Sequence, residues 1–218
     1  MNLLFDLDGT LTDPLPGIAR SIQHALVTLG REAPDISELR RFVGPPLRAS
    51  LAELFGSRDV EVVSRAIAHY RDRFARIGMF ENGVYPGVVE ELERLTAAGH
   101  VMWVVTSKPH VYAAAIVDHF DLRRFFRSVY GSELDGRLVD KSESIRLVLE
   151  QEALDANETW MIGDRAADIR GGHDNGTRTA GVLWGYGLED ELCAAEPDVL
   201  VRSASELTAA IDSYRPAL

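Results

Sequence analysis

Residues 5–13 read FDLDGTLTD, and they continue an apolar run that begins at Leu3. A short apolar run that stops at turn-forming residues is typical of a buried parallel strand. Asp6 and Asp8 follow this run directly, although like charges this close repel each other and resist loss of water. Gly9 permits an unusual backbone turn and Thr10 adds a hydroxyl beside the acidic pair. The stretch therefore predicts a strand that ends in a polar site, and we interpret Asp13, beside Pro14, as a turn residue.

Four further apolar runs recur along the chain, at residues 101–105, 159–162, 179–183 and 199–201. Segments with helical spacing of apolar residues lie between and after them. Strands that are apolar on both faces belong in a parallel sheet covered by helices. We therefore predict an α/β fold, a Rossmann-like parallel sheet core with helices on both faces.

Residues 15–80 depart from this alternation and contain no convincing strand. Apolar residues recur instead at helical spacing over residues 18–29 and again over residues 63–77, as in a small helical bundle. We predict a core of residues 1–14 and 81–218 and an inserted helical cap of residues 15–80. An insert at this point is expected over the carboxyl ends of the strands, where open α/β sheets bind ligands.

The net charge of −11, from 34 acidic and 23 basic residues, argues against nucleic acid or an anionic membrane as a partner. An anionic ligand would need a local positive charge, which a divalent cation in an acidic cluster can supply. Cys193 is the only cysteine, and no apolar run is long enough to cross a membrane. We expect a cytoplasmic protein.

A second acidic pair, Asp164 and Asp168, follows the apolar run at residues 159–162. A spacing of four places both carboxylates on one face of a first helical turn. Two acidic strand ends in one sheet predict a site for a hard cation, and Mg²⁺ prefers such oxygen ligands.

Two further motifs follow the same logic. Thr106 is expected at the last position of its strand, with its hydroxyl and the neighbouring amides open to a phosphate oxygen. Ser107 fits a helix cap and Pro109 the first helical position. Lys141 opens a predicted helix, where a cation works against the helix dipole, so it is a candidate for function.

The motifs FDLDGTLTD, VVTSKP, DK before a helix and MIGDRAAD, in this order, resemble those of the haloacid dehalogenase superfamily of phosphatases with an α-helical cap. The resemblance implies that Asp6 is the nucleophile and forms an aspartyl-phosphate. Asp8 would act as general acid and then as general base, with its backbone carbonyl on Mg²⁺. Asp164 would bind the metal directly, and Asp168 would hold metal-bound water or orient Lys141.

The resemblance also implies the substrate contacts. Thr106 and Lys141 would hold the nonbridging phosphate oxygens. The further candidates are Gly9, Thr10 and Ser107 in the core, and Arg48 with residues 44–47 in the cap. The substrate would be a small phosphate monoester.

Asp8 indicates a phosphatase, since haloacid dehalogenases resemble this layout but lack the second aspartate. The segments GPPL, TSKP and GVLWGYG are most similar to the 5'-nucleotidase-like branch, with phosphoglycolate phosphatases next. A phosphomutase of the β-phosphoglucomutase type is an alternative, and a noncatalytic module that resembles response-regulator receivers is another. The chain contains no G-x-G-x-x-G or Walker motif, which counts against a dinucleotide oxidoreductase or a kinase.

Overall fold

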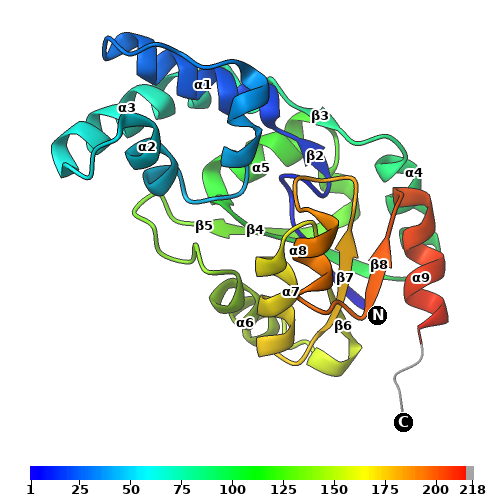
Figure 1. Cartoon of the computed structure of the whole chain (residues 1–218). Coiled ribbons are helices and arrows are strands. Elements are labelled where there is room, and N and C mark those ends of the chain that lie inside the picture. Colours follow the sequence, from blue (N-terminus) through cyan, green and yellow to red (C-terminus); the bar gives the residue numbers. More distant parts are fainter. Residues whose placement is uncertain (215–218) are drawn as a thin grey trace. The chain divides into compact units, whose positions relative to one another are not determined.

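The protein contains a six-stranded sheet in the computed structural model, which describes residues 1–214 (Figure 1). The strands lie in the order β5-β4-β1-β6-β7-β8, and all neighbouring pairs are parallel. Their bounds are β1 (Asn2–Phe5), β4 (Val101–Pro109), β5 (Phe126–Ser132), β6 (Thr159–Gly163), β7 (Arg178–Val182) and β8 (Val199–Val201). The predicted α/β class is confirmed, and β5 is a strand that the sequence analysis does not predict.

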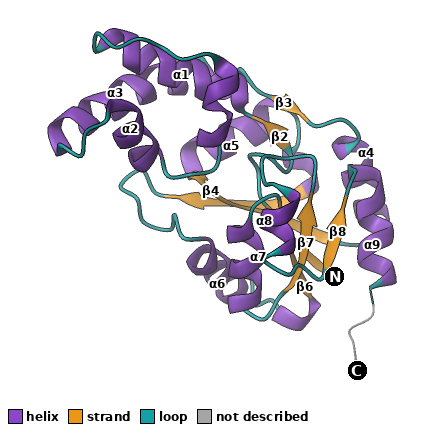
Figure 2. Ribbon diagram, viewed as in Figure 1, coloured by secondary structure: helices purple, strands orange, loops and turns teal. Residues whose placement is uncertain are grey.

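Helices cover both faces of the sheet (Figure 2). They are α4 (Val88–Ala97), α5 (His110–His119), α6 (Lys141–Gln151), α7 (Ala166–Asp174), α8 (Glu189–Cys193) and α9 (Leu207–Ser213). Connections between parallel strands are right-handed. The direction in which the chain crosses the sheet therefore decides on which face of the sheet each connecting helix lies. The chain runs from β1 outward to β5 through α4 and α5, then back across the sheet to β8 through α6, α7 and α8. The two directions place these two sets of helices on opposite faces.

The core lies between the central strands and α6. Leu4, Trp103 and Met161, from three neighbouring strands, pack with Ile145 and Val148 from α6, and each of the five is at most 1% exposed. Burial on both faces explains why β1 is a continuous apolar run. Because the central strands are parallel, the polar residues that follow them meet at one edge of the sheet.

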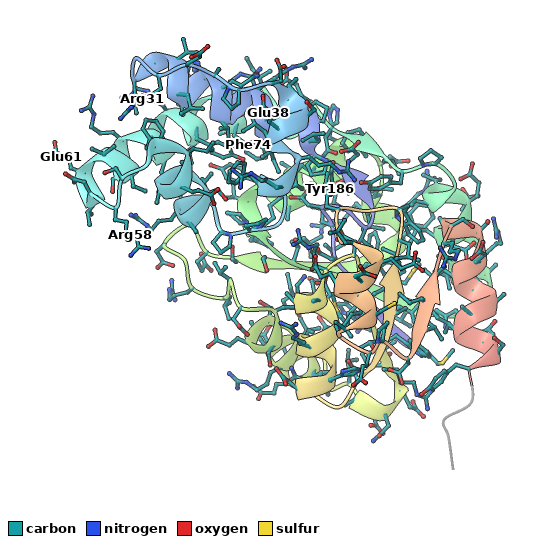
Figure 3. All side chains as sticks on the ribbon, in the orientation of Figure 1. Arg31, Glu38, Arg58, Glu61, Phe74 and Tyr186 are labelled. Carbon is teal, nitrogen blue, oxygen red and sulfur yellow. The ribbon has the colours of Figure 1, made fainter. Side chains whose placement is uncertain are left out.

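The described chain divides into two compact units, one of residues 1–12 with the chain from Val84 onward, the other of residues 13–83. The second unit contains α1 (Leu15–Thr28), a 3-10 helix (Ile36–Phe42), α2 (Leu47–Phe55) and α3 (Val60–Arg76). Ile22 of α1 is buried, and so is Phe74 of α3, which is labelled in Figure 3. Two short strands, β2 (Thr12–Asp13) and β3 (Gly83–Val84), carry the chain between the units and pair with each other.

Two local features correspond to predictions from the sequence. Asp13 is the last residue of β2, and its Oδ1 accepts a hydrogen bond of 3.1 Å from the backbone N–H of Leu15, so it contributes to the turn that follows the strand. Over residues 1–214 no helix is both long and apolar enough to cross a membrane.

Candidate active site

Asp6 stands at the carboxyl end of β1. Its backbone N–H donates to the carbonyl of Ile162 on β6 at 2.9 Å. The hydrogen bonds between β1 and β6 therefore continue to Asp6, one residue beyond the end of β1. The chain then turns at Gly9, whose φ of +91° lies in the left-handed region. This turn leaves Asp6 buried, at 8% exposed, and brings the following loop back over the strand end.

Three carboxylates meet at this edge of the sheet. Asp6, Asp164 and Asp168 are all buried, and one carboxylate oxygen of each lies within 4.8 Å of those of the other two. β1 and β6 are parallel neighbours, so the residues that follow them emerge side by side. The structure thus brings together two acidic motifs that are more than 150 residues apart in the sequence.

The expected placement of Asp164 and Asp168 on one helical turn is wrong. α7 begins at Ala166, so Asp164 lies in the bend before the helix while Asp168 lies in its first turn. Asp168 Oδ2 accepts the backbone N–H of Arg165 at 3.1 Å, which caps the helix. The two side chains still converge, because the bend after β6 directs Asp164 toward Asp6.

Lys141 links two members of this acidic cluster. Its Nζ lies 3.0 Å from Asp6 Oδ1 and 2.8 Å from Asp168 Oδ1, and it donates to the carbonyl of Val105 at 2.9 Å. The residue begins α6, whose cap is Asp140. Burial by itself would lower the pKa of Lys141, but the carboxylates of Asp168 and Asp6 raise it above its usual value. Lys141 is therefore a fixed cation between the two acids.

A glycine-rich loop after β7 encloses Asp164. The backbone N–H of Tyr186, labelled in Figure 3, donates to Asp164 Oδ2 at 2.7 Å. A Cβ atom at Gly9 or Gly185 would collide with the Asp164 side chain, and one at Gly187 with its carbonyl oxygen. These three glycines are therefore required by close approach to one residue, Asp164. Gly185 and Gly187 belong to the motif GVLWGYG, which by itself indicates only a family resemblance and not this packing against Asp164.

Thr10 is also buried, and its side chain lies against Asp164. Its hydroxyl lies 3.4 Å from Asp164 Oδ1 as a donor, and its carbonyl accepts the indole N–H of Trp184 at 2.9 Å. The side chain of Thr10 is therefore placed to orient Asp164, whereas its predicted contact with substrate stays a prediction.

β4 continues past Thr106 to Pro109, so the expected end of this strand at Thr106 is wrong. Pro109 pairs with Ser132 of β5 after a shift in register, and this pairing prolongs the strand. α5 begins at His110, so Ser107 is not its cap. The Ser107 hydroxyl donates to the carbonyl of Val139 at 2.8 Å, which gives it a structural partner.

Asp8 is not one of the three clustered carboxylates, and it forms a close ion pair with Lys108. Lys108 lies within the motif VVTSKP, but its residue type and position predict no role for it. Burial raises the pKa of Asp8, and Lys108 opposes that rise. Arg48, the predicted cap contact, is exposed in the first turn of α2.

A family model for haloacid dehalogenase-like hydrolases matches residues 3–182, which include every one of these groups except the loop after β7. The chain belongs to the haloacid dehalogenase-like hydrolase family. It is thus an enzyme of the phosphatase class in that family, whose named relatives span nearly all of the chain.

Relatives within the family have several names. A Pseudomonas aeruginosa protein named 5'-nucleotidase is 45% identical over 98% of this chain and 96% of its own. A Mycobacterium bovis protein named tyrosine-protein kinase PtkA is 32% identical over 99% and 72%. A Vibrio parahaemolyticus phosphoglycolate phosphatase is 30% identical over 94% and 93%. The crystal structure of a "predicted phosphatase" from Clostridium acetobutylicum superposes with a TM-score of 0.90, at 40% identity over 96% and 97% of the two chains.

The hydrolase site fits a divalent cation. Burial, then the charges of Asp168 and Asp6, raise the pKa of Asp164 to about 7. Burial likewise raises the pKa of Asp168 to about 6, although Lys141 opposes this. The site holds four aspartates but two lysines, so the carboxylates lack countercharge. Asp6, Asp164 and Asp168 offer the oxygen ligands that Mg²⁺ prefers, and phosphatases of this family generally use that ion.

Proposed function

We propose that the protein is a Mg²⁺-dependent phosphatase that hydrolyses a small phosphate monoester through an aspartyl-phosphate on Asp6. The convergence of Asp6, Asp164 and Asp168 around Lys141 carries this proposal. A nucleophilic carboxylate must stay ionised close to an anionic substrate, and only nearby positive charge makes that possible. Lys141 supplies part of this charge, and the acidic cluster supports a cation that would supply the rest.

In the first step an oxygen of Asp6 attacks phosphorus. The bond from phosphorus to the leaving oxygen breaks, its electron pair passes to that oxygen, and Asp8 gives it a proton. The products are the aspartyl-phosphate on Asp6, the free alcohol and an ionised Asp8. Burial favours the protonated form of Asp8 that this step needs.

In the second step a water molecule attacks the phosphorus of the intermediate. Asp8 takes a proton from this water, and the bond between phosphorus and Asp6 breaks with return of its electron pair to the Asp6 carboxylate. Inorganic phosphate leaves, and both aspartates are restored to their starting states. One carboxyl group thus serves as acid and then as base.

Thr106 and Lys141 are proposed to hold the nonbridging oxygens of the phosphoryl group, where negative charge must be stabilised. The Thr106 hydroxyl accepts the backbone N–H of Lys108 at 3.2 Å, and this use of a lone pair leaves its O–H able to donate. When bound, Mg²⁺ would neutralise charge on the transferring group. Asp6, Asp164 and Asp168 would hold it, together with the backbone carbonyl of Asp8.

We take a nucleoside 5'-monophosphate as the first substrate to test, because the relative at 45% identity is named 5'-nucleotidase. Phosphoglycolate is the second, from the name of the relative at 30% identity. We propose that residues 15–80 act as a cap that selects among such esters. Arg48 and residues 44–47 are its candidate contacts. The cap segment begins directly after the loop that carries Asp6 and Asp8, so it is connected to the catalytic loop.

A substrate panel tests the activity. Phosphate release is measured with nucleoside 5'-monophosphates, phosphoglycolate and hexose phosphates, each with Mg²⁺ and with a chelator. Release that requires Mg²⁺ supports the proposal, while an isomerised hexose phosphate supports a phosphomutase. Transfer of phosphate from ATP to tyrosine, without phosphate release from any ester, would support a kinase.

Two variants test the residues. Asp6→Asn should abolish phosphate release, whereas Asp13→Asn, the same change at a turn residue of the same motif, should retain it. Full activity in Asp6→Asn would remove the nucleophile and reopen the noncatalytic alternative. Arg48→Ala should change the relative rates across the panel, and unchanged ratios would remove Arg48 from the selecting surface.

A further inference from the structure

The sequence contains two lysines among its 23 basic residues, Lys108 and Lys141. Both side chains are buried, at 7% and 5% exposed. A buried ammonium group requires a partner, because its loss of hydration costs several kcal/mol. The proposed function uses Lys141 and gives no task to Lys108, so this second buried cation needs its own account.

Lys108 forms its ion pair with one oxygen of Asp8, Oδ2. The other oxygen, Oδ1, is buried and has no hydrogen-bond partner within residues 1–214. The two oxygens of this carboxyl group are therefore in different surroundings. An oxygen that accepts from an ammonium group disfavours a proton of its own, so a proton on Asp8 belongs on Oδ1.

The end of β4 holds Lys108 in place. Ser132 Oγ donates to the carbonyl of Ser107 at 2.8 Å, and the Ser107 hydroxyl donates to Val139. A Cβ atom at Gly131 would lie 2.6 Å from the carbonyl oxygen of Lys108, so this backbone packs closely against β5. Because β4 extends beyond Thr106, the backbone of Lys108 is held within the strand and its side chain reaches Asp8.

We propose that Lys108 is a positioning residue for Asp8, which holds Oδ2 so that Oδ1 presents its proton to the leaving oxygen. This inference rests on the proposed function. As the bond from phosphorus to the leaving oxygen breaks and its electron pair passes to that oxygen, the Oδ1 proton moves to it. Lys108 contributes by orientation and neither gains nor loses a proton.

A leaving-group comparison isolates this role. p-Nitrophenyl phosphate releases a stable phenolate that barely needs protonation, whereas an alkyl phosphate releases an alkoxide that needs it. The parameter kcat/KM reports the steps up to transfer to Asp6, so it senses the leaving group and not the later hydrolysis. General acid catalysis contributes about 10²–10⁴-fold.

We therefore expect Lys108→Met to lower kcat/KM by about 100-fold for the best alkyl phosphate of the panel, and by less than about 3-fold for p-nitrophenyl phosphate. Lys108→Arg, which keeps the charge, should recover part of the loss. Arg202→Met is the matched control, because Arg202 is 69% exposed and pairs with Glu189 on the surface. It should leave both substrates unchanged.

Other roles of Lys108 predict other results. Contact with the phosphate group itself would lower kcat/KM equally for both substrates, and such a result overturns the inference. Unchanged values for both substrates overturn it as well. Thermal unfolding of each variant shows whether Lys108→Met folds, and Lys108→Arg provides the comparison if it does not.

A double-mutant cycle with Asp8→Asn gives an independent check. If Lys108 acts through Asp8, Lys108→Met should add less than about 3-fold to the alkyl phosphate loss already present in Asp8→Asn. Additive losses overturn the inference while leaving the proposed function intact. Failure of the proposed function would appear separately, as an active Asp6→Asn variant or as a wild-type protein that releases no phosphate.

Discussion

The backbone N–H of Tyr186 donates a 2.7 Å hydrogen bond to Asp164 Oδ2, across 22 positions of sequence. This bond ties the loop after β7 to the bend after β6. The loop approaches so closely that Gly185 has no space for a side chain, because a Cβ atom there would collide with the Gly9 carbonyl and with Asp164. The position of this proposed metal ligand thus depends on a glycine that itself offers no ligand.

Gly185→Ala should weaken Mg²⁺ binding, because the added methyl group displaces Asp164 or the loop that holds it. We expect the Mg²⁺ concentration for half-maximal stabilisation against heat to rise at least about 10-fold, since partners of metal ligands typically contribute 10–100-fold. Gly83→Ala is the control, because a Cβ atom there meets nothing within 4 Å. An unchanged Mg²⁺ midpoint in Gly185→Ala would show that the loop does not position Asp164.

Lys141→Met should destabilise the protein without Mg²⁺ by about 3–5 kcal/mol, because Asp6 and Asp168 would keep buried charge without their cation. Urea unfolding in a chelator measures this change. Arg146→Met on the same helix should cost less than about 0.5 kcal/mol, since its pair with Glu150 is exposed. Equal costs for both variants would contradict the buried pairing of Lys141.

Much of the core could be predicted, because a strand whose two faces are both buried has a continuous run of apolar residues. β1 and β6 are of this kind, and the acidic residues at their ends indicated the cluster. β5 could not be found this way, because it is the edge strand of the sheet and places exposed Arg127 and partly buried Ser128 between buried Phe126 and buried Val129. An edge strand has no neighbour on its outer side and can keep polar residues there. β5 therefore has no continuous apolar run by which it could be recognised.

The candidate site was only partly predictable for a similar reason. Asp6, Asp164 and Lys141 each follow or precede a strong local pattern, so residue type and position suggested a role. The pairing of Lys108 with Asp8 spans 100 positions and depends on how far β4 continues. That extension depends on a shift in register between β4 and β5. Such a pairing between distant strands cannot be predicted from the local sequence TSKP.

The smaller unit offers a test of electrostatics away from the site. Arg73 binds Glu81 through two nitrogens, at 2.7 and 3.1 Å, and Arg20 adds a contact of 2.9 Å. The hydrogen bond from Arg73, followed by that from Arg20, holds the pKa of Glu81 below its usual value of 4.5. A lowered carboxyl pKa stabilises the fold at pH values above the unfolded pKa, and this contribution is lost as the pH falls through the folded value.

Glu81→Gln should therefore reduce the free energy of unfolding at pH 7, and its difference from wild type should shrink as the pH falls below about 4.5. Urea unfolding of both proteins at pH 7, 5 and 4 measures this convergence. Arg73→Ala should cost more than Arg20→Ala, because the Arg73 side chain is 18% exposed and Arg20 is 48% exposed. A difference between wild type and Glu81→Gln that stays constant from pH 7 to pH 4 would show that Glu81 titrates alike in the folded and unfolded chain, and that its pairing with Arg73 contributes nothing to stability.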